Sequence, residues 1–129
     1  MMAIVLFPLQ LIALESPVAP ICGGDDIKQL VDCYADKYGV DKKLAHYIVK
    51  NESQYNPELV GDMGITCKRT GKPVRARGLV QITECYYPEV TDEQAFNPNF
   101  NLEFGMELIK NKKTCISQFT TCRNYYNAQ

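Results

Sequence analysis

Apolar residues recur at the 3.6-residue spacing of an α-helix in four parts of the chain, and no segment shows the period of two that is typical of a half-buried strand. The spacing predicts helices over residues 27–38, 42–52, 99–112 (beginning at residue 99 or 101) and 118–126. A capping box, Thr91-Asp92-Glu93-Gln94, opens one further helical turn. Residues 61–77 hold three glycines, one proline and five basic residues, so we predict a long loop there. These patterns indicate a mainly α fold with a long irregular central loop.

The predicted helix boundaries carry residues that favour helix ends. Asp25 or Asp26 precedes the first helix, Gly39 follows it, and Asp41 precedes the second helix. The Asn56-Pro57 dipeptide stops the second helix because the residue before a proline avoids the α region.

Length and composition narrow the class of protein. The chain has 129 residues, which is the size of one domain, and its 46% apolar fraction excludes disorder. The net charge of −1 argues against a nucleic-acid partner, and no apolar run is long enough to span a membrane. Ala3–Leu14 is an apolar run of signal-peptide length without a basic stretch before it. We therefore expect residues 1–20 to be a signal peptide or an N-terminal apolar segment, and residues 21–129 to be a monomeric domain.

The chain contains six cysteines and a single histidine, His46. The cysteines are widely spaced and form no Cys-x-x-Cys pair, so a zinc site is poorly supported. Three disulfides in an oxidising compartment fit the even number better, with six free thiols as the alternative. The sequence alone selects no pairing, but proximity along the chain favours Cys22–Cys33, Cys67–Cys85 and Cys115–Cys122. The last pair requires a turn near Ser117–Thr121, because one continuous helix would hold its cysteines about 10 Å apart.

One carboxylate, that of Glu52, falls on the apolar side of the predicted 42–52 helix. At about 100° per residue, Ala45, Ile48 and Val49 form the apolar stripe, and Glu52 lies within it. Burial and the helix C-terminus both disfavour the charged form, so the pKa of Glu52 is predicted to lie above the ordinary glutamate value. A glutamate that is protonated near neutral pH can act as a general acid. The alternative is a glutamate at a frayed helix end whose side chain turns out to solvent.

One motif contains this glutamate, and a second follows the central loop. The first is Glu52-Ser53, followed by an aromatic residue and by Asn56-Pro57. The second is Gly78-Leu79-Val80-Gln81-Ile82. Two more motifs follow, Ala95-Phe96-Asn97-Pro98 running on to Asn101-Leu102-Glu103-Phe104-Gly105, and Tyr126-Asn127-Ala128.

Together the four motifs cover about residues 27–128. In this order they resemble the lysozyme-like lytic transglycosylases of the soluble Slt type, which are kin to goose-type lysozymes. The resemblance departs from the family pattern at Val80, where relatives usually have methionine.

The resemblance implies a lysozyme-like fold that cleaves the β-1,4 bond between N-acetylmuramic acid and N-acetylglucosamine in peptidoglycan glycan strands, without a cofactor or a metal. Glu52 would protonate the glycosidic oxygen and then take the proton of the muramyl C6 hydroxyl, which closes a 1,6-anhydro ring. Gln81 would line the cleft, and Tyr126, or Tyr125 in its place, would hydrogen-bond Glu52. The other implied substrate-binding residues are Ser53, Gly78, Leu79 and Asn127. A protein of this kind is expected to be secreted, periplasmic or in the cell envelope.

Several alternatives stay open. Asp62 could orient a water, which would make the protein a hydrolase of the goose-type lysozyme kind. The fold could also belong to an inactive glycan-binding protein or to a chitin-directed glycosidase. Tyr86 and Tyr87 could stack on sugar rings or pack beneath the loop. The basic residues of the loop, Lys68, Arg69, Lys72, Arg75 and Arg77, are either solvated or hold anionic groups of peptidoglycan.

Overall fold

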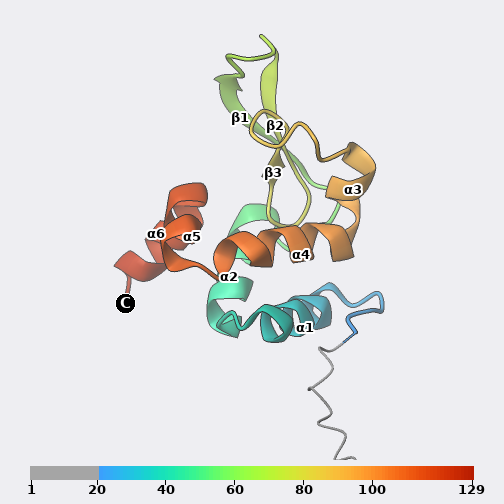
Figure 1. Cartoon of the computed structure of the whole chain (residues 1–129), viewed down its shortest axis with the longest axis vertical. Helices are drawn as coiled ribbons and strands as arrows, with labels where there is room; N and C mark the ends of the chain where they lie inside the picture. The colour runs from blue at the N-terminus through green and yellow to red at the C-terminus, as the bar shows by residue number, and fades with distance from the viewer. Residues whose placement is uncertain (1–20) are drawn as a thin grey trace, which may run out of the picture.

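The computed structural model describes residues 21–129, which form six helices and three short strands (Figure 1). The prediction of a mainly α, disulfide-stabilised single domain is confirmed. The predicted N-terminal segment, residues 1–20, lies outside the described residues. No helix within residues 21–129 combines the length and the apolar character needed to cross a membrane. The elements are α1 (Ile27–Tyr38), α2 (Lys42–Ser53), β1 (Val60–Thr66), β2 (Pro73–Arg77), β3 (Ile82–Thr83), α3 (Asp92–Phe96), α4 (Pro98–Ile109), α5 (Lys112–Gln118) and α6 (Thr120–Asn127).

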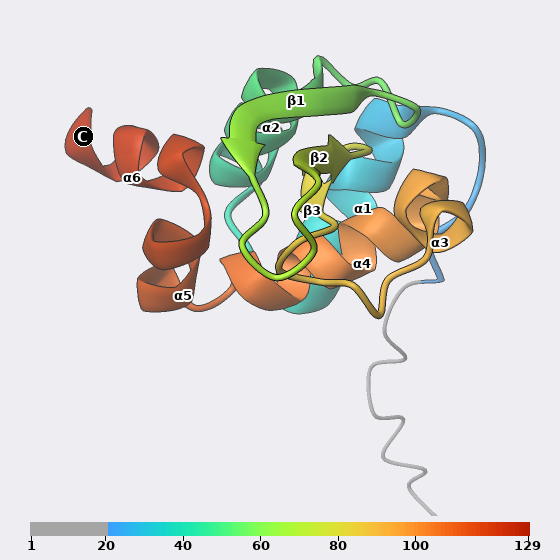
Figure 2. The same cartoon turned by 90° about the horizontal axis from the view of Figure 1, so that it is seen from above.

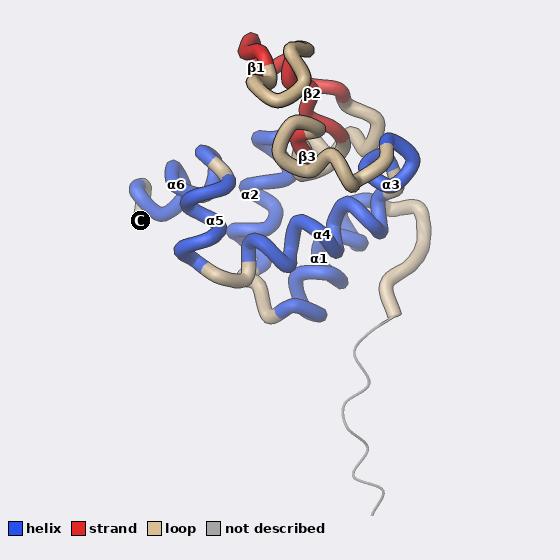
Figure 3. The backbone as a smooth tube through the Cα atoms, turned by 45° about the horizontal axis from the view of Figure 1, so that its top comes forward, coloured by secondary structure: helices blue, strands red, loops and turns tan. Residues whose placement is uncertain are grey.

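The helices and the strands occupy different parts of the molecule. In Figure 1, α1, α2 and α4 lie together, α5 and α6 form a pair at one side, and the β1–β2 hairpin projects at the opposite end from α1. Figure 3 shows the same separation of the strands from the helices, and Figure 2 looks down onto the hairpin, with α4 beneath it.

The sequence signals at the helix ends are confirmed by hydrogen bonds. Asp26 and Asp41 each accept a bond from a backbone N–H in the first turn of α1 and α2, at 3.1 and 2.8 Å. Gly39 ends α1 in the left-handed conformation, with φ 66°. Thr91 and Gln94 make both bonds of the predicted capping box at α3, at 3.1 and 3.0 Å.

Several helix boundaries differ from the prediction. Helix α4 begins at Pro98 because proline suits the first turn of a helix, where its missing N–H is not needed. The same helix ends at Ile109 rather than near residue 112. Asn111 then caps a separate helix, α5, by accepting a bond of 3.0 Å from a backbone N–H. The predicted helix over 118–126 is α6, which begins at Thr120.

Residues 61–77 are largely an antiparallel hairpin of β1 and β2, not the irregular loop that we predicted. Strand β3 pairs with the other edge of β2, which gives the order β1-β2-β3. The register pairs Asp62 with Arg75 and Thr66 with Pro73, with an irregularity between the two pairs. Nearly all side chains of β1 are exposed, so the strand has no buried face. Period-two alternation detects a strand only when one face is buried, and this explains why the pattern missed β1.

Arg77 is buried, which corrects the interpretation of this basic residue as part of a solvated loop. Its side chain is 1% exposed. Its Nη1 donates to Val90 O at 2.9 Å and to Asp92 Oδ1 at 3.0 Å, and its Nε donates to Ile82 O at 3.3 Å. Arg77 and Arg75 together hold the pKa of Asp92 below its usual value. The guanidinium therefore ties the segment after β3 to the sheet.

The three disulfides favoured by proximity along the chain are present. The Cα–Cα distances are 5.7 Å for Cys22–Cys33, 5.6 Å for Cys67–Cys85 and 5.8 Å for Cys115–Cys122. Between the last two cysteines the chain turns at Phe119, whose φ of −126° and ψ of 118° separate α5 from α6. The turn predicted near Ser117–Thr121 is thereby confirmed.

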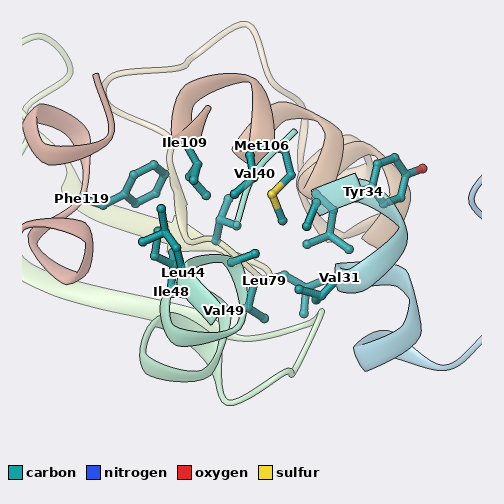
Figure 4. Packing of buried hydrophobic residues seen from close by; sticks show 14 of the residues in the cluster. Val31, Tyr34, Val40, Leu44, Ile48, Val49, Leu79, Met106, Ile109 and Phe119 are labelled. Carbon is teal, nitrogen blue, oxygen red and sulfur yellow. The ribbon is translucent and has the colours of Figure 1, made fainter. Parts of the chain in front are cut away.

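The core lies where α1, α2 and α4 meet the segment that follows β2 (Figure 4). The predicted apolar stripe of α2, Ala45, Ile48 and Val49, is fully buried. Leu79, from the segment after β2, and Met106, from α4, are also fully buried. Further members of the same cluster are Val31, Tyr34, Val40, Leu44, Ile109 and Phe119.

Asn101 is fully buried in the first turns of α4, and its side chain bonds only to backbone groups. Its Nδ2 donates to Ala95 O at 2.8 Å and to Arg77 O at 3.1 Å, and its Oδ1 accepts from Val80 N at 2.9 Å. Gly78 is required beside it, because its φ is 73° and a Cβ there would collide with Ala95 O and with the Asn101 amide. The amide therefore fixes the chain that leaves β2 against α3 and α4.

Replacing Asn101 by alanine is expected to lower the free energy of unfolding by about 3 kcal/mol, because three buried backbone groups lose their partner. Urea denaturation of the oxidised protein measures this loss. The matched control is Asn124→Ala at an exposed position of α6, which should change the value by no more than about 0.5 kcal/mol. Equal stability of the two variants would contradict the anchoring role of Asn101.

Candidate active site

Glu52 lies in the last turn of α2, and its carboxylate contacts α6. Thr121 Oγ1 donates a hydrogen bond of 2.9 Å to Glu52 Oε1. Burial raises the pKa of Glu52 above the ordinary glutamate value, and the bond from Thr121 acts in the opposite direction. The direction predicted from the helical pattern is confirmed, and the side chain does not turn away into solvent.

A cleft of about 430 Å³ opens beside Glu52. Its walls come from β1, the segment after β2, α4 and the turn between α5 and α6. Among the described residues that line it, Glu52 is the one carboxylate. Aromatic and apolar surface with a few polar groups is typical of a small-ligand pocket, and aromatic rings suit the faces of sugars. The lining residues are Glu52, Met63, Val80, Gln81, Ile82, Thr83, Tyr86, Tyr87, Phe104, Leu108, Ser117, Gln118, Phe119 and Thr120.

Comparison with known protein families gives the classification. The model of the transglycosylase SLT domain matches residues 29–128. The chain belongs to this family. The match runs from α1 to α6 and includes every element that lines the cleft. The resemblance based on the four motifs is therefore confirmed, and membership supports a lytic transglycosylase-type activity on peptidoglycan. The comparison with solved structures found no match.

Of the motif residues of this SLT domain, Gln81 lines the cleft as predicted. It has a left-handed backbone conformation, with φ 57°, and its Nε2 donates to Gly78 O at 2.9 Å and to Leu59 O at 3.2 Å. Gly61 faces the side-chain oxygen of Gln81 so closely that a Cβ would not fit between them. The glutamine is thus held by backbone groups on both sides of the hairpin base.

Three other motif residues are buried and do not line the cleft. Leu79 is a core residue with 0% exposure. Ser53 is 2% exposed, and its hydroxyl donates to Val49 O at 3.0 Å. The close approach permitted by Gly78 is to Asn101 and Ala95, whereas we had expected the backbone to approach the glycan there. In this structure the three residues support the walls of the cleft, and direct contact with a glycan stays a prediction for each.

Thr121, and not a tyrosine, is the hydrogen-bond donor to Glu52. Tyr126 and Asn127 lie further along α6, and the ring of Tyr126 packs beneath Lys112 Nζ at 4.4 Å from its centroid. Tyr125 packs edge-on against Tyr126 at 5.5 Å. The motif at Tyr126 therefore pointed to the right helix but to the wrong residue, because a hydrogen bond across 69 residues has no local signal in the sequence.

The other candidate carboxylates lie outside the cleft lining. Asp62 is exposed on β1, where its Oδ1 accepts from Gly64 N at 2.8 Å. Asp92 binds Arg75 and Arg77 at 3.0 Å each. Within residues 21–129, no group of three His, Cys, Asp or Glu side chains is placed to hold a metal ion.

The two aromatic residues after Cys85 both line the cleft but differ in exposure. Tyr86 is 67% exposed, which leaves its ring free to contact a sugar. Tyr87 donates to Gln118 Oε1 at 2.7 Å and packs edge-on against Phe104 at 4.9 Å. Tyr87 therefore joins the wall formed by α4 to the turn after α5.

The chain leaves α2 through two consecutive left-handed residues, Gln54 (φ 52°) and Tyr55 (φ 62°). Such conformations of non-glycine residues need support from their surroundings. The Tyr55 hydroxyl lies 2.9 Å from His46 Nδ1, and His46 Nε2 lies 2.7 Å from Asp32 Oδ1. This network joins α1, α2 and the turn, and it fixes the end of α2 that carries Glu52. The sequence did not point to it.

Glu52→Gln is expected to be more stable than the wild type at about pH 7, and the difference should shrink near pH 4. The folded state holds the Glu52 proton more tightly than the unfolded state, because burial raises the pKa. Wild-type stability therefore falls as the pH rises from the ordinary glutamate range through the raised value. Glutamine is uncharged and can still accept from Thr121, so the variant avoids this loss. Urea unfolding across this pH range measures the difference.

Two variants of Thr121 serve as controls in the same measurement. Thr121→Val removes the bond that favours the carboxylate and should steepen the loss of stability with pH. Thr121→Ser keeps a hydroxyl donor and should follow the wild type. A difference between the wild type and Glu52→Gln that does not vary with pH would contradict the raised pKa.

Proposed function

We propose that the protein cleaves the β-1,4 bond between N-acetylmuramic acid and N-acetylglucosamine in peptidoglycan as a lytic transglycosylase, with Glu52 as both acid and base. The observation that carries the proposal is the single, partly buried carboxylate among the described lining residues of the cleft. Ordinary glycosidases place two carboxylates on either side of the bond. A reaction whose nucleophile belongs to the substrate needs only one.

The proposed reaction balances without water. The protonated carboxyl of Glu52 gives its proton to the glycosidic oxygen, and the bond between that oxygen and C1 of the muramyl residue breaks. The muramyl C6 oxygen then bonds to C1, and its proton passes to the Glu52 carboxylate. The products are a 1,6-anhydro-muramyl end and a free hydroxyl on the departing sugar, and Glu52 is again protonated.

The surroundings of Glu52 suit both proton transfers. Burial keeps the carboxyl protonated to a higher pH than an exposed glutamate, as a general acid requires. The bond from Thr121 orients the carboxyl and favours the carboxylate, as the second step requires. Around the site, Tyr86 offers an exposed ring and Thr83 offers a hydroxyl to the glycan.

Hydrolysis is the weaker candidate on this geometry. A lysozyme of the goose type would use a second acid to orient water. Asp62, the candidate for that role, is exposed on β1, does not line the cleft, and accepts a bond from the backbone of Gly64. The position of this carboxylate therefore supports the lyase reaction.

The three disulfides support a place in the cell envelope or outside the cell, because such bonds persist in oxidising compartments. Peptidoglycan lies in the same compartments. We propose that residues 21–129 act there as a secreted or periplasmic domain.

Glu52→Gln is expected to lower kcat/KM on purified peptidoglycan by at least about 100-fold, since the amide neither donates nor accepts the reacting proton. Mass spectrometry of the products should show anhydro-muramyl ends from the wild type and their near absence from the variant.

The product masses also separate the alternatives. Asp62→Asn is the matched control and should release the same anhydro products as the wild type. Reducing ends that carry an added water, lost in Asp62→Asn, would instead identify a hydrolase. No products from the oxidised wild type would favour a glycan-binding role.

A further inference from the structure

A second hollow lies on the hairpin, separate from the cleft that holds Glu52. It has a volume of about 410 Å³, and we call it the hairpin groove. Figure 1 shows the hairpin projecting at one end of the molecule, beside the loop that follows β3. The groove is lined by Cys67, Thr70, Lys72, Pro73, Arg75, Glu84 and Cys85.

One short segment separates the hairpin groove from the cleft. Thr83 and Tyr86 line the cleft, and the residues between them, Glu84 and Cys85, line the groove. The Cys67–Cys85 disulfide, with a Cα–Cα distance of 5.6 Å, fixes the hairpin turn to this wall. If a ligand in the cleft carries a side branch near Tyr86, that branch therefore needs to cross only this segment to enter the groove.

The acidic groups at the groove are already paired. Arg75 lies 2.7 Å from Glu84 and 3.0 Å from Asp92. These bonds neutralise Glu84, the one carboxylate of the groove lining, and raise the pKa of Arg75. Neither Lys68 nor Lys72 has a carboxylate within ion-pair distance in the described part of the chain.

Hydrogen-bond donors at the groove remain available. Arg69 Nη2 donates to Cys85 O at 2.8 Å, which holds its guanidinium at the wall and leaves its other N–H groups free to bind. Thr70 Oγ1 accepts from Lys72 N at 3.3 Å, so its own hydrogen can be donated. The chain as a whole has a net charge of −1, so the excess of cationic donors at the groove is local. Such a set matches a carboxylate.

We propose that the hairpin groove binds a carboxylate of the stem peptide on the glycan strand that occupies the cleft. The inference rests on the proposed function, since it takes peptidoglycan as the substrate. The peptide is covalently attached to the muramyl residue, so binding of the sugar brings its carboxylates to the groove at a high effective concentration. The groove thereby selects glycan that still carries peptides over bare glycan.

The experiment compares two substrates that differ only in the peptide. The first is peptidoglycan freed of attached anionic polymers, and the second is the same glycan after an amidase has removed the peptides. The measured quantity is the ratio of kcat/KM on the first to kcat/KM on the second. Lys72→Met, alone and with Arg69→Met, is expected to lower this ratio about two- to fivefold through KM, the size typical of exposed charge pairs. Lys43→Met, an exposed lysine at the start of α2, is the matched control and should keep the wild-type ratio.

The remaining outcomes also decide the inference. An unchanged ratio, or equal losses on both substrates, overturns it. A loss seen only when the anionic polymers are left attached overturns it in favour of polymer binding. If the wild type cleaves neither substrate, the proposed function fails, and NMR titration with a disaccharide tetrapeptide decides the groove by itself. Amide shifts at Thr70, Lys72 and Cys85 that disappear when the peptide carboxyls are amidated support it, and their absence overturns it.

Discussion

The shape of the cleft depends on the hydrogen bonds made by the side chain of Asn101. Its three bonds hold the chain leaving β2 against α3 and α4. The segment so fixed carries Gln81 and Thr83 into the wall of the cleft. Strand β1 buries almost no side chain, so it has little apolar surface to hold it in place. Directional hydrogen bonds therefore fix the position of this segment, which hydrophobic packing alone would not determine.

Glu52 is held by a different part of the molecule. Helix α2 presents it beside the core, and the Cys115–Cys122 disulfide staples α5 to α6 so that Thr121 meets its carboxylate. Keeping a carboxylate partly desolvated costs stability, and no cation within residues 21–129 acts on its pKa in compensation. A carboxyl that is partly buried in a cleft suits acid catalysis, because burial raises its affinity for the proton. The same feature links the stability of the protein to its proposed chemistry.

Local features of the sequence predicted local structure well. The capping box at Thr91, the helix stop at Gly39 and the disulfides depended on residues near one another in the chain, and the structure confirms them. The hairpin was missed because β1 is exposed and so leaves no alternating pattern. The burial of Arg77 and the contact of Thr121 with Glu52 depend on residues brought together only by the fold. The motifs pointed to the right regions, but they could not tell a residue of the cleft from one that supports its wall.

The most direct test of the account is a crystal structure of the Glu52→Gln variant with a tetrasaccharide of alternating N-acetylmuramic acid and N-acetylglucosamine. We expect the sugars to fill the cleft, with one glycosidic oxygen and the C6 hydroxyl of the adjoining muramyl residue both about 2.6–3.2 Å from the side-chain amide at position 52. A tetrasaccharide whose glycosidic oxygens all lie beyond reach of position 52, or one bound on another face, would contradict the central role of Glu52.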